Sequence, residues 1–387
     1  MDDILIIGGG ASGLMCAYLL AKNGKNVTVL EKNDRVGKKL LATGNGKCNL
    51  TNVNLTLEDY NTALIKDILD EFTPKKVIEE FASMGLLTKV DGEGRVYPYS
   101  ESANTVLNVL MRRLDEYGVK IVCEALVNKV TPIDGRWKAI TSKGEYIGDK
   151  AIFACGSNAT SGLDSLGLMS SLGHSVIPFR YAIAPLTCDG IKGMGGVRAK
   201  VSASIFINGK EMMGERGELL FKDDAISGIL AFRLSSALAR YSEKVESCKV
   251  TVDFAPDIQQ EQLADFIYAN CSVYAPLEGI LHKAIAQNVL SRVPMDRSWI
   301  MSRKKANDIA KACKAFDVNI LGVGARANAQ VACGGVLLNE LDTRTLQSRL
   351  HGGLYCIGES VDVDGLCGGC NLHWSWASAM AASKDLI

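Results

Sequence analysis

Residues 1–31 contain two apolar runs separated by a glycine-rich turn and a helical pattern. The run at 4–7 is continuous, which is typical of a strand that is buried on both faces of a parallel sheet. The turn GGGASG follows, and apolar residues then recur at helical spacing up to Gly24. A second apolar run, at 27–30, ends at Glu31. The pattern predicts a βαβ unit whose glycines lie between the first strand and the helix.

Further along the chain the pattern predicts an α/β domain that is interrupted once. The segment 38–52 has little periodicity and is expected to be an ordered loop. Helices are predicted at 58–72, 74–84, 102–117 and 163–172, and strands at 120–123, 126–130, 137–141 and 146–154. From about residue 189 alternating strand patterns appear, and about 256–314 is mostly helical. Strand patterns then return before a final helix that starts near Asn371.

Composition narrows the class of protein. The 387 residues carry 43 Lys plus Arg and 43 Asp plus Glu, so a broad electrostatic surface for nucleic acid or anionic membrane is not expected. Glycine is frequent (38) and proline rare (8), which suits tight turns close to a ligand. The start MDDILIIGGG is not expected to be a signal peptide, and no transmembrane helix is expected because no apolar run is long enough. The 12 cysteines are therefore expected to be reduced thiols in a cytoplasmic protein.

The first candidate site is the pattern Gly8, Gly10, Gly13 followed by Glu31 at the end of the second strand. One glycine permits the tight turn, the second lets a pyrophosphate approach the backbone, and the third lets helix and strand pack closely. The free N–H groups and the dipole of the helix N-terminus favour the diphosphate. A carboxylate at Glu31 can accept hydrogen bonds from ribose hydroxyls. This spacing predicts dinucleotide binding, but it leaves FAD and NAD open.

The C-terminal segment favours a flavin. A short buried strand at 354–357 is followed by Gly358 and Glu359, and an acid there can bind hydroxyls of a polyol such as the ribityl chain. The stretch 365–369 contains three glycines and leads into the last helix, whose N–H groups could stabilise negative charge on a reduced flavin ring. A glycine-rich turn before an ordinary terminal helix is the alternative.

Several stretches resemble the HI0933-type flavoproteins, a family that includes enzymes described as aminoacetone oxidases and bile-acid dehydro-steroid reductases. The stretches are GGGASGL, TGNGKCNLTN, GELLFKDDAISG, GGV, GLYCIGESVDVDG and GGCNLHWSWAS, and they extend over essentially the whole chain. The second of them and the combined GExxDVDGxxGGxN pattern are far more specific than GxGxxG. The resemblance implies FAD as the cofactor. It also implies a Rossmann-type FAD-binding domain with an inserted β-barrel subdomain and a small helical subdomain.

The predicted division follows from the pattern and the resemblance together. Residues 1–188 and 317–387 are expected to form the FAD-binding domain, 189–256 an inserted β-rich subdomain and 257–316 an inserted helical subdomain. The resemblance implies FAD contacts at Gly8, Gly10, Ser12, Gly13, Glu31, Lys32, Lys38, Thr43, Gly44, Gly46, Cys48, Asn49, Val127, Ala154, Gly156, Gly358, Glu359, Gly369, Asn371 and Leu372. Two positions depart from the family pattern: Lys47 stands where arginine is usual, and Cys370 where tyrosine is more frequent.

The sequence assigns no catalytic residue. Cys367 and Cys370 form a CxxC, for which a redox-active dithiol and two small residues in a glycine-rich turn both remain open. His373 and Tyr181 are candidates for a proton donor, although each can equally be a structural side chain. No metal site is predicted, because no second Cys or His pair lies nearby at a zinc-ligand spacing.

These observations together predict an FAD-dependent oxidoreductase that transfers a hydride through flavin N5. NAD(P)H is the expected transient electron donor, since no second GxGxxG with a downstream acid is present. The preferred reaction is reduction of a conjugated C=C bond in a small or steroid-like organic substrate. An oxidase of a small amine or aminoketone, a non-catalytic or RNA-associated flavin-binding protein, and an NAD-only dehydrogenase are the alternatives. Neither a nucleic-acid partner nor a membrane is expected, and the sequence gives no oligomeric state.

Overall fold

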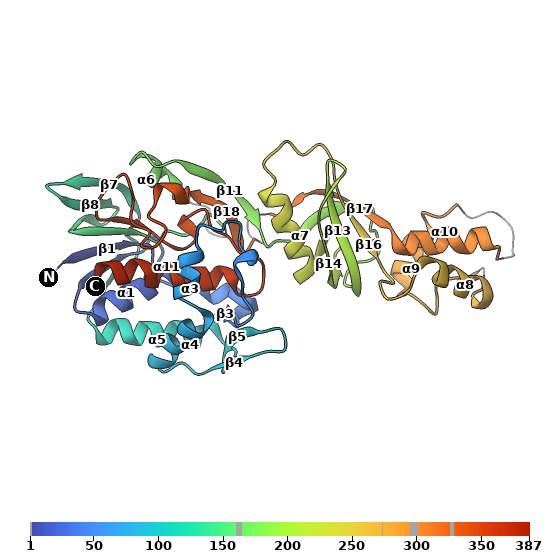
Figure 1. The fold of residues 1–387 in the computed structure, drawn as a ribbon, viewed down its shortest axis with the longest axis horizontal. Helices are drawn as coiled ribbons and strands as arrows, with labels where there is room; N and C mark the ends of the chain where they lie inside the picture. Colours follow the sequence, from blue (N-terminus) through green and yellow to red (C-terminus); the bar gives the residue numbers. More distant parts are fainter. Residues whose placement is uncertain (1, 160–164, 273, 295–300, 326–328) are drawn as a thin grey trace. The chain divides into compact units, whose positions relative to one another are not determined.

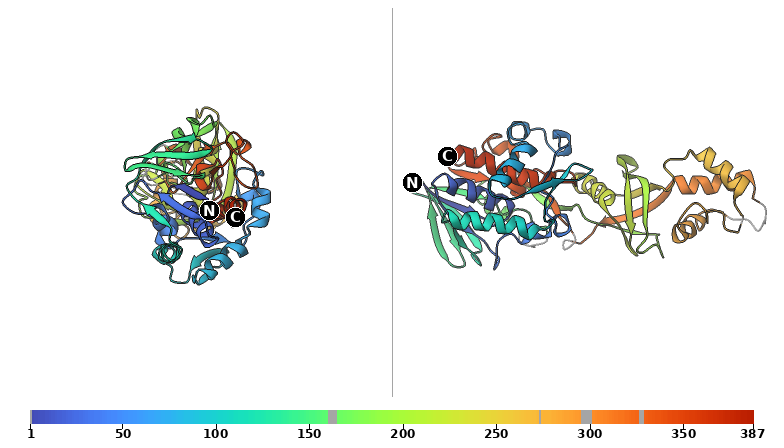
Figure 2. Two further views of the ribbon diagram at one scale, coloured as in Figure 1. Left: turned by 90° about the vertical axis from the view of Figure 1, so that its left-hand side faces the viewer. Right: turned by 90° about the horizontal axis from the view of Figure 1, so that it is seen from below.

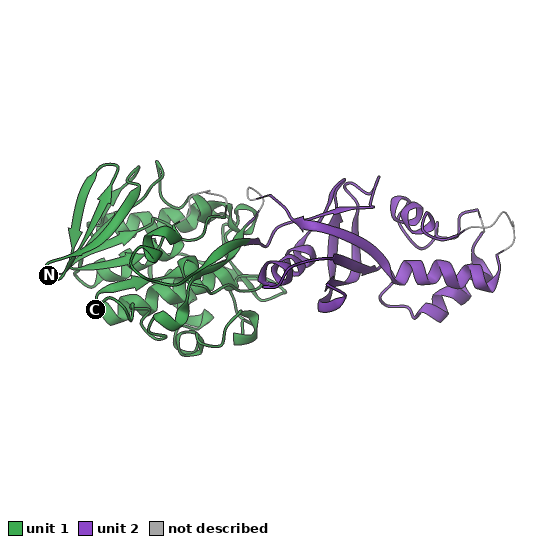
Figure 3. Ribbon diagram, turned by 90° about the horizontal axis from the view of Figure 1, so that it is seen from above, with its two compact units in different colours: residues 1–180, 330–387 green, residues 181–329 purple. Residues whose placement is uncertain are grey.

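The computed structural model describes residues 2–159, 165–272, 274–294, 301–325 and 329–387. It divides the chain into two compact units (Figure 3). Unit 1 comprises Met1–Arg180 and Gln330–Ile387, and unit 2 comprises Tyr181–Ala329. The first unit is therefore built from both ends of the chain, and the second is an insertion within it.

Unit 1 is organised around a five-stranded parallel sheet (Figure 1). Its order is β19 (Leu354–Cys356), β10 (Lys150–Phe153), β1 (Asp3–Ile7), β2 (Asn26–Leu30) and β6 (Lys120–Val122). In the register, Ile6 lies opposite Val29 on one side and Ile152 on the other. These apolar residues are buried, as expected for strands that are covered on both faces. Because all the strands are parallel, the loops that follow them gather at one edge of the sheet.

The sheet is the middle of three layers (Figures 1 and 2). Helix α1 (Ala11–Lys22) packs against α11 (Cys370–Leu386) and α5 (Ala103–Glu116). A three-stranded antiparallel meander, β7 (Val127–Ile133), β8 (Arg136–Thr141) and β9 (Gly144–Gly148), contacts β1 and β10 from the other side. Helix α11 is buried along nearly its whole length, so the C-terminal segment is part of the core of this unit.

Smaller elements complete unit 1. A three-stranded sheet has the order β3 (Thr51–Asn52), β5 (Arg95–Pro98), β4 (Thr88–Val90), and β11 (Val176–Ala182) pairs with β18 (Val331–Val336). The short helices are α2 (Lys38–Ala42), α3 (Lys66–Glu71), α4 (Pro74–Ser83) and α6 (Leu166–Ser170). Four 3₁₀ turns are η1 (Thr43–Gly46), η2 (Leu57–Asp59), η4 (Leu338–Glu340) and η5 (Gly358–Ser360).

Unit 2 contains a closed six-stranded barrel. Its order is β12 (Leu186–Asp189), β15 (Ala225–Ser227), β14 (Lys210–Phe221), β13 (Arg198–Ile207), β16 (Cys248–Asp253) and β17 (Phe316–Val323). Helix α7 (Ile229–Arg240) packs on β14, while α10 (Arg303–Lys314) packs on α8 (Gln260–Asn270) and α9 (Lys283–Leu290). Barrel and helices share one cluster of buried apolar residues, so the helical part is not a separate core.

The predicted fold class, an α/β domain with an inserted β-barrel and a helical part, is confirmed. The insertion was predicted to run from 189 to 316, whereas unit 2 runs from 181 to 329. The reason is that β12 lies before the first predicted boundary and β17 extends past the second. These two strands pair with each other and close the barrel.

Three local predictions are corrected. The segment 38–52 is not only loop, because it contains α2. Only 66–71 of the predicted helix 58–72 is α-helical. The predicted strand 146–154 is two strands, β9 and β10, in different sheets, and the break follows Gly148, where an added β-carbon would lie 2.8 Å from Leu5 Cγ. The predicted helix 163–172 starts outside the described residues, and α6 covers 166–170.

Within the described segments, no helix is both long enough and apolar enough to cross a membrane.

Candidate cofactor site

Of the three motif glycines, Gly10 has space for a side chain, whereas Gly8 and Gly13 do not. A β-carbon added at Gly8 would lie 2.3 Å from the Ala154 carbonyl oxygen, and one added at Gly13 would lie 2.0 Å from the Gly8 carbonyl oxygen. No heavy atom lies within 4 Å of a β-carbon added at Gly10. Because no side chain caps α1, its first N–H groups are available to a ligand. The geometry matches the roles expected for the three glycines in phosphate binding.

The carboxylate of Glu31 is buried directly beside this turn. Its Oε2 accepts the Gly9 N–H at 2.8 Å, while Oε1 accepts the backbone N–H and the side-chain Nδ2 of Asn33 at 2.8 and 2.5 Å. These bonds fix the orientation of the carboxylate at the carboxyl end of β2. Each oxygen has two lone pairs, so the group can still accept hydrogen bonds from ribose hydroxyls.

A cavity of about 700 Å³ lies next to Glu31 and has mostly apolar walls. Its lining includes Ile7, Leu30, Lys32, Val127, Cys155 and Leu168. Burial raises the pKa of the Cys155 thiol to about 12 and lowers the pKa of the Lys32 ammonium. The thiol is therefore neutral at physiological pH. A flat, largely apolar group such as an adenine ring fits this chemistry.

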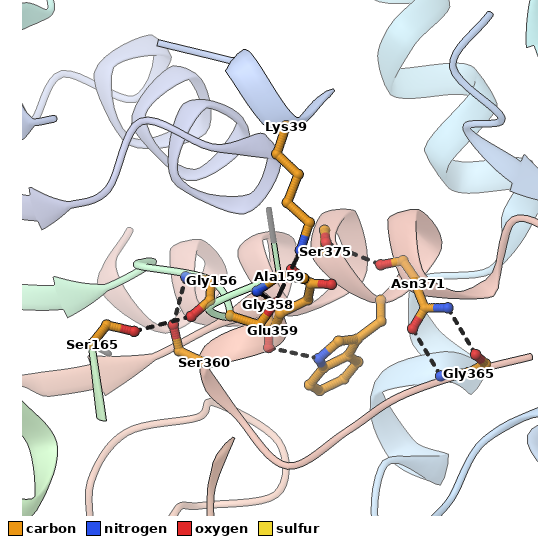
Figure 4. A network of polar contacts seen from close by, with 12 residues as sticks. Lys39, Gly156, Ala159, Ser165, Gly358, Glu359, Ser360, Gly365, Asn371 and Ser375 are labelled. Atoms are coloured by element: carbon orange, nitrogen blue, oxygen red, sulfur yellow. Dashed lines mark hydrogen bonds and ion pairs between the residues drawn. The ribbon is translucent and has the colours of Figure 1, made fainter. Parts of the chain in front are cut away.

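An ion pair joins the loops that follow three strands (Figure 4). Lys39 Nζ in α2 lies 2.5 Å from Glu359 Oε2 and donates to Ser157 Oγ at 3.0 Å. Lys39 comes after β2, Ser157 after β10 and Glu359 after β19. The Lys39 side chain is 28% exposed and that of Glu359 13% exposed, so the pair is partly shielded from water.

Two glycines allow these loops to approach one another. The N–H of Gly156 donates to Ser360 Oγ at 3.0 Å, and its carbonyl accepts from Ser165 Oγ at 3.2 Å. A β-carbon added at Gly358 would lie 2.5 Å from Ser12 Oγ in the first turn of α1. Both glycines have positive φ angles, of 66° and 63°, which other residues rarely adopt. The end of β19 is therefore packed directly against the N-terminus of α1.

The start of α11 is held by its own side chains. Asn371 Oδ1 accepts the Gly365 N–H at 2.9 Å, and Nδ2 donates to the Gly365 carbonyl at 2.7 Å (Figure 4). Trp374 Nε1 donates to the Gly358 carbonyl at 3.0 Å. These bonds fix the glycine-rich segment 365–369 and join it to the end of β19. No side chain caps α11, so its first N–H groups also remain available to a ligand.

The loop 43–49 reaches the same helix. Cys48 has a φ of 59°, its N–H donates to the Thr43 carbonyl at 3.0 Å, and burial raises the pKa of its thiol to about 12. Asn49 Oδ1 is buried without a hydrogen-bond partner and lies 3.1 Å from a β-carbon added at Gly369, where α11 begins. A buried amide oxygen of this kind favours a ligand that donates a hydrogen bond.

The structure thus brings together most of the residues implied by the resemblance. The first turn of α1, the ends of β2, β10 and β19, the loop 43–49 and the start of α11 meet within unit 1. Ser12, Lys32, Thr43, Gly44, Gly46, Ala154, Gly156 and Leu372 lie in or directly after these elements, while Val127, the first residue of β7, lines the cavity beside Glu31. Their individual contacts with FAD stay predictions.

One residue of the implied set has its side chain at the surface, and its contact with FAD stays a prediction. Lys38 forms an ion pair with Asp34, and both side chains are largely exposed. Lys39, Ser157 and Ser360 lie in the site, although the sequence did not single them out. Because 38–42 is helical, consecutive side chains point about 100° apart, and only one of two adjacent lysines can face the site. A loop prediction for 38–52 carries no such spacing, so it cannot distinguish Lys38 from Lys39.

The proposed proton donors and the CxxC have different surroundings. His373 is fully buried, its Nδ1 lies 2.9 Å from Thr51 Oγ1, and burial lowers its pKa to about 4, which is unsuited to a proton donor at neutral pH. Tyr181 belongs to unit 2. Cys367 and Cys370 are both thiols, and the Tyr60 hydroxyl donates to the Cys370 carbonyl at 2.8 Å. These contacts favour structural roles for His373 and Cys370.

Comparison with known proteins places this geometry in a family. A 3-dehydro-bile acid delta(4,6)-reductase of Clostridium scindens is 33% identical over 99% of this chain and 98% of its own length. A ribosomal RNA dihydrouridine synthase of Haemophilus influenzae is 27% identical over 100% of this chain and 98% of its own length. The solved 3-ketosteroid-delta4-(5alpha)-dehydrogenase from Rhodococcus jostii RHA1 has a TM-score of 0.47 at 13% identity, and the alignment covers 99% of this chain and 96% of that chain. The profile of the HI0933-like protein Rossmann domain matches residues 2–385, and the chain belongs to the HI0933-like family.

Proposed function

We propose that this chain, as an FAD-dependent oxidoreductase of its family, reduces a conjugated C=C bond in a small or steroid-like organic substrate, with hydride passing through flavin N5. NAD(P)H is the proposed electron donor. The observation that carries the proposal is the arrangement of residues at the carboxyl ends of the parallel strands in unit 1. There Gly10 is open while Gly8 and Gly13 are packed against backbone, and a buried acid and a cavity of about 700 Å³ lie alongside.

The residues present fit FAD along its whole length. Glu31 would accept the ribose hydroxyls, and the apolar cavity beside it would hold the adenine. The N–H groups of α1 would bind the diphosphate, and Glu359 the ribityl hydroxyls. The N-terminus of α11 would face the ring and favour negative charge on it. The protein would thus supply position and electrostatics, and the cofactor the redox chemistry.

The relatives support reduction rather than oxidation. One is named as a reductase of a 3-dehydro-bile acid and the other as a synthase of dihydrouridine, so both names describe products with added hydrogen. A small-molecule substrate agrees better with the zero net charge of the chain than RNA does.

The test is anaerobic reduction of the purified flavin-loaded protein by NADH or NADPH, followed by reoxidation. Loss of the flavin absorbance with either donor, and its return with a steroid enone, would support the proposal. Return only with oxygen would indicate an oxidase, and return only with a ribosomal RNA transcript would indicate an RNA-modifying enzyme. Either result, or absence of bleaching with both donors, would overturn the proposal. Glu31→Ala is expected to retain less flavin, because it removes the proposed ribose acceptor and the acceptor of the Gly9 N–H.

A further inference from the structure

The Lys39–Glu359 ion pair (Figure 4) joins two segments that each contact the glycine turn or the first turn of α1. Helix α2, which carries Lys39, is anchored to the glycine turn because the Gly37 N–H donates to the Gly9 carbonyl at 2.8 Å. At the other end, Glu359 follows the glycine that packs against Ser12 in the first turn of α1. Both partners of the ion pair are therefore fixed relative to this helix.

The same ion pair crosses the path that a dinucleotide would take. In the sheet order, β1 and the N-terminus of α1 lie between β2 on one side and β10 and β19 on the other. Glu31 ends β2 and Glu359 follows β19, while Gly10 is the open position between them. An extended dinucleotide that reaches both acids must carry its diphosphate past Gly10. Lys39 lies in α2, which follows β2, and its ammonium reaches the carboxylate of Glu359, which follows β19.

A diphosphate and the Glu359 carboxylate would both bind the Lys39 ammonium. Because the Lys39–Glu359 ion pair is partly shielded from water, the repulsion between the diphosphate and the carboxylate would be substantial without this cation. A lysine suits this position because its charge is compact and its four-carbon stem is flexible. The adjacent Lys38 differs from Lys39, because its ammonium pairs with Asp34 at the surface.

We propose that Lys39 is a ligand of the cofactor diphosphate and that Glu359 competes with the diphosphate for the Lys39 ammonium. The inference deepens the proposed function and rests on it. Competition makes the two residues act in opposite directions: Lys39 strengthens diphosphate binding, and Glu359 weakens it. ADP is a suitable probe, because it carries the diphosphate but lacks the ribityl chain that Glu359 is expected to bind.

The experiment measures ADP and FAD affinity by calorimetry on the full-length chain after bound flavin has been removed. Lys39→Met is expected to lower the ADP affinity at least about tenfold and to reduce its salt dependence, whereas Lys39→Arg should stay within about threefold of wild type. Glu359→Gln is expected to raise the ADP affinity about threefold or more. Lys75→Met, a control at an exposed lysine of α4 in the same unit, should leave both affinities within about twofold. Circular dichroism and thermal melting verify that each variant is folded.

Several outcomes would overturn the proposal. If Lys39→Met weakens FAD but not ADP, then Lys39 acts only by orienting Glu359 toward the ribityl chain. If Glu359→Gln leaves ADP affinity unchanged or lower, there is no competition. Equal losses in Lys75→Met and Lys39→Met would indicate a general effect of positive charge. A wild-type chain that binds neither FAD nor ADP would overturn the proposed function as well, whereas failure of the variants alone leaves that function intact.

Discussion

The side chain of Asn371 is paired with the backbone of Gly365 through two hydrogen bonds, of 2.9 and 2.7 Å. This pairing closes residues 365–371 into a small ring at the start of α11. The amide thus fixes a glycine-rich segment whose residues would otherwise have many backbone conformations. The resemblance implies an FAD contact at Asn371, which stays a prediction, and the structure shows that its side chain shapes the loop beside the proposed ring site.

Replacing Asn371 should therefore affect both stability and cofactor retention. Asn371→Ala leaves two partly buried backbone groups without partners, and the free energy of unfolding should fall by about 1–3 kcal/mol. The flavin-to-protein absorbance ratio of the purified protein should fall as well. Asn270→Ala, which removes one exposed bond to the Phe266 carbonyl, should change the free energy of unfolding by less than about 0.5 kcal/mol. Urea unfolding that shows the same free energy for Asn371→Ala and wild type would contradict this interpretation.

Two glycines of one turn should respond in different ways to the same substitution. Gly13→Ala places a methyl group 2.0 Å from the Gly8 carbonyl oxygen, so the free energy of unfolding should fall by roughly 2 kcal/mol or more. Gly10→Ala meets no atom of the described residues within 4 Å, and the φ of −87° suits alanine, so stability should fall by less than about 1 kcal/mol, the cost of alanine in place of glycine at a helix N-cap. FAD affinity should nevertheless fall about tenfold or more, because the methyl group occupies the space proposed for the diphosphate. Calorimetric titration with FAD and urea unfolding of both variants separate the two effects. Tight FAD binding by Gly10→Ala would exclude a diphosphate at this position.

The thiols near the proposed site should be chemically inert. Burial raises the pKa values of Cys48 and Cys155 to about 12, so little thiolate forms near pH 8. Cys271 in unit 2 is partly exposed, and its pKa is raised without reaching the range of the other two thiols. Iodoacetamide should therefore modify Cys271 in the native protein well before Cys48 or Cys155, as read by peptide mass spectrometry, and the three should react alike in urea. Early labelling of Cys48 in the native protein would contradict its assigned environment.

The sequence predicted the elements of unit 1 best where an apolar pattern lies next to a glycine-rich turn. The apolar runs that flank GGGASG predicted β1, α1 and β2 within a few residues, since a doubly buried strand must be apolar throughout. The last helix was located in the same way, although its burial on nearly all sides appears only in the structure. Glu31 was placed correctly at the end of β2 because its position follows directly from the strand that precedes it.

The remaining features depend on contacts between distant segments. The strands β9 and β10 were merged because both are strand-like and only the contact of Gly148 with Leu5 separates them. Helix 58–72 was overextended because its first part is held by the C-terminal loop, where the Asn61 N–H donates to the Asp364 carbonyl at 3.1 Å. Lys39 was overlooked since its partner, Glu359, lies 320 residues away in the chain. Periodicity reports which face of an element is buried, but not which residue lies across from it.

The fully buried His373 should make stability depend on pH. Its pKa is lowered from 6.5 to about 4 by burial, so the unfolded chain binds a proton at this residue more readily than the folded chain. Stability from this residue is complete above about pH 6.5 and decreases as pH falls toward 4, by roughly 3 kcal/mol in total. Urea unfolding between about pH 7.5 and 5 should therefore show a steeper loss for wild type than for His373→Asn, which cannot titrate in this range. Asn270→Ala, which removes no titratable group, should keep the wild-type slope. If His373→Asn also keeps that slope, His373 is not held neutral in the core, and its exclusion as a proton donor fails.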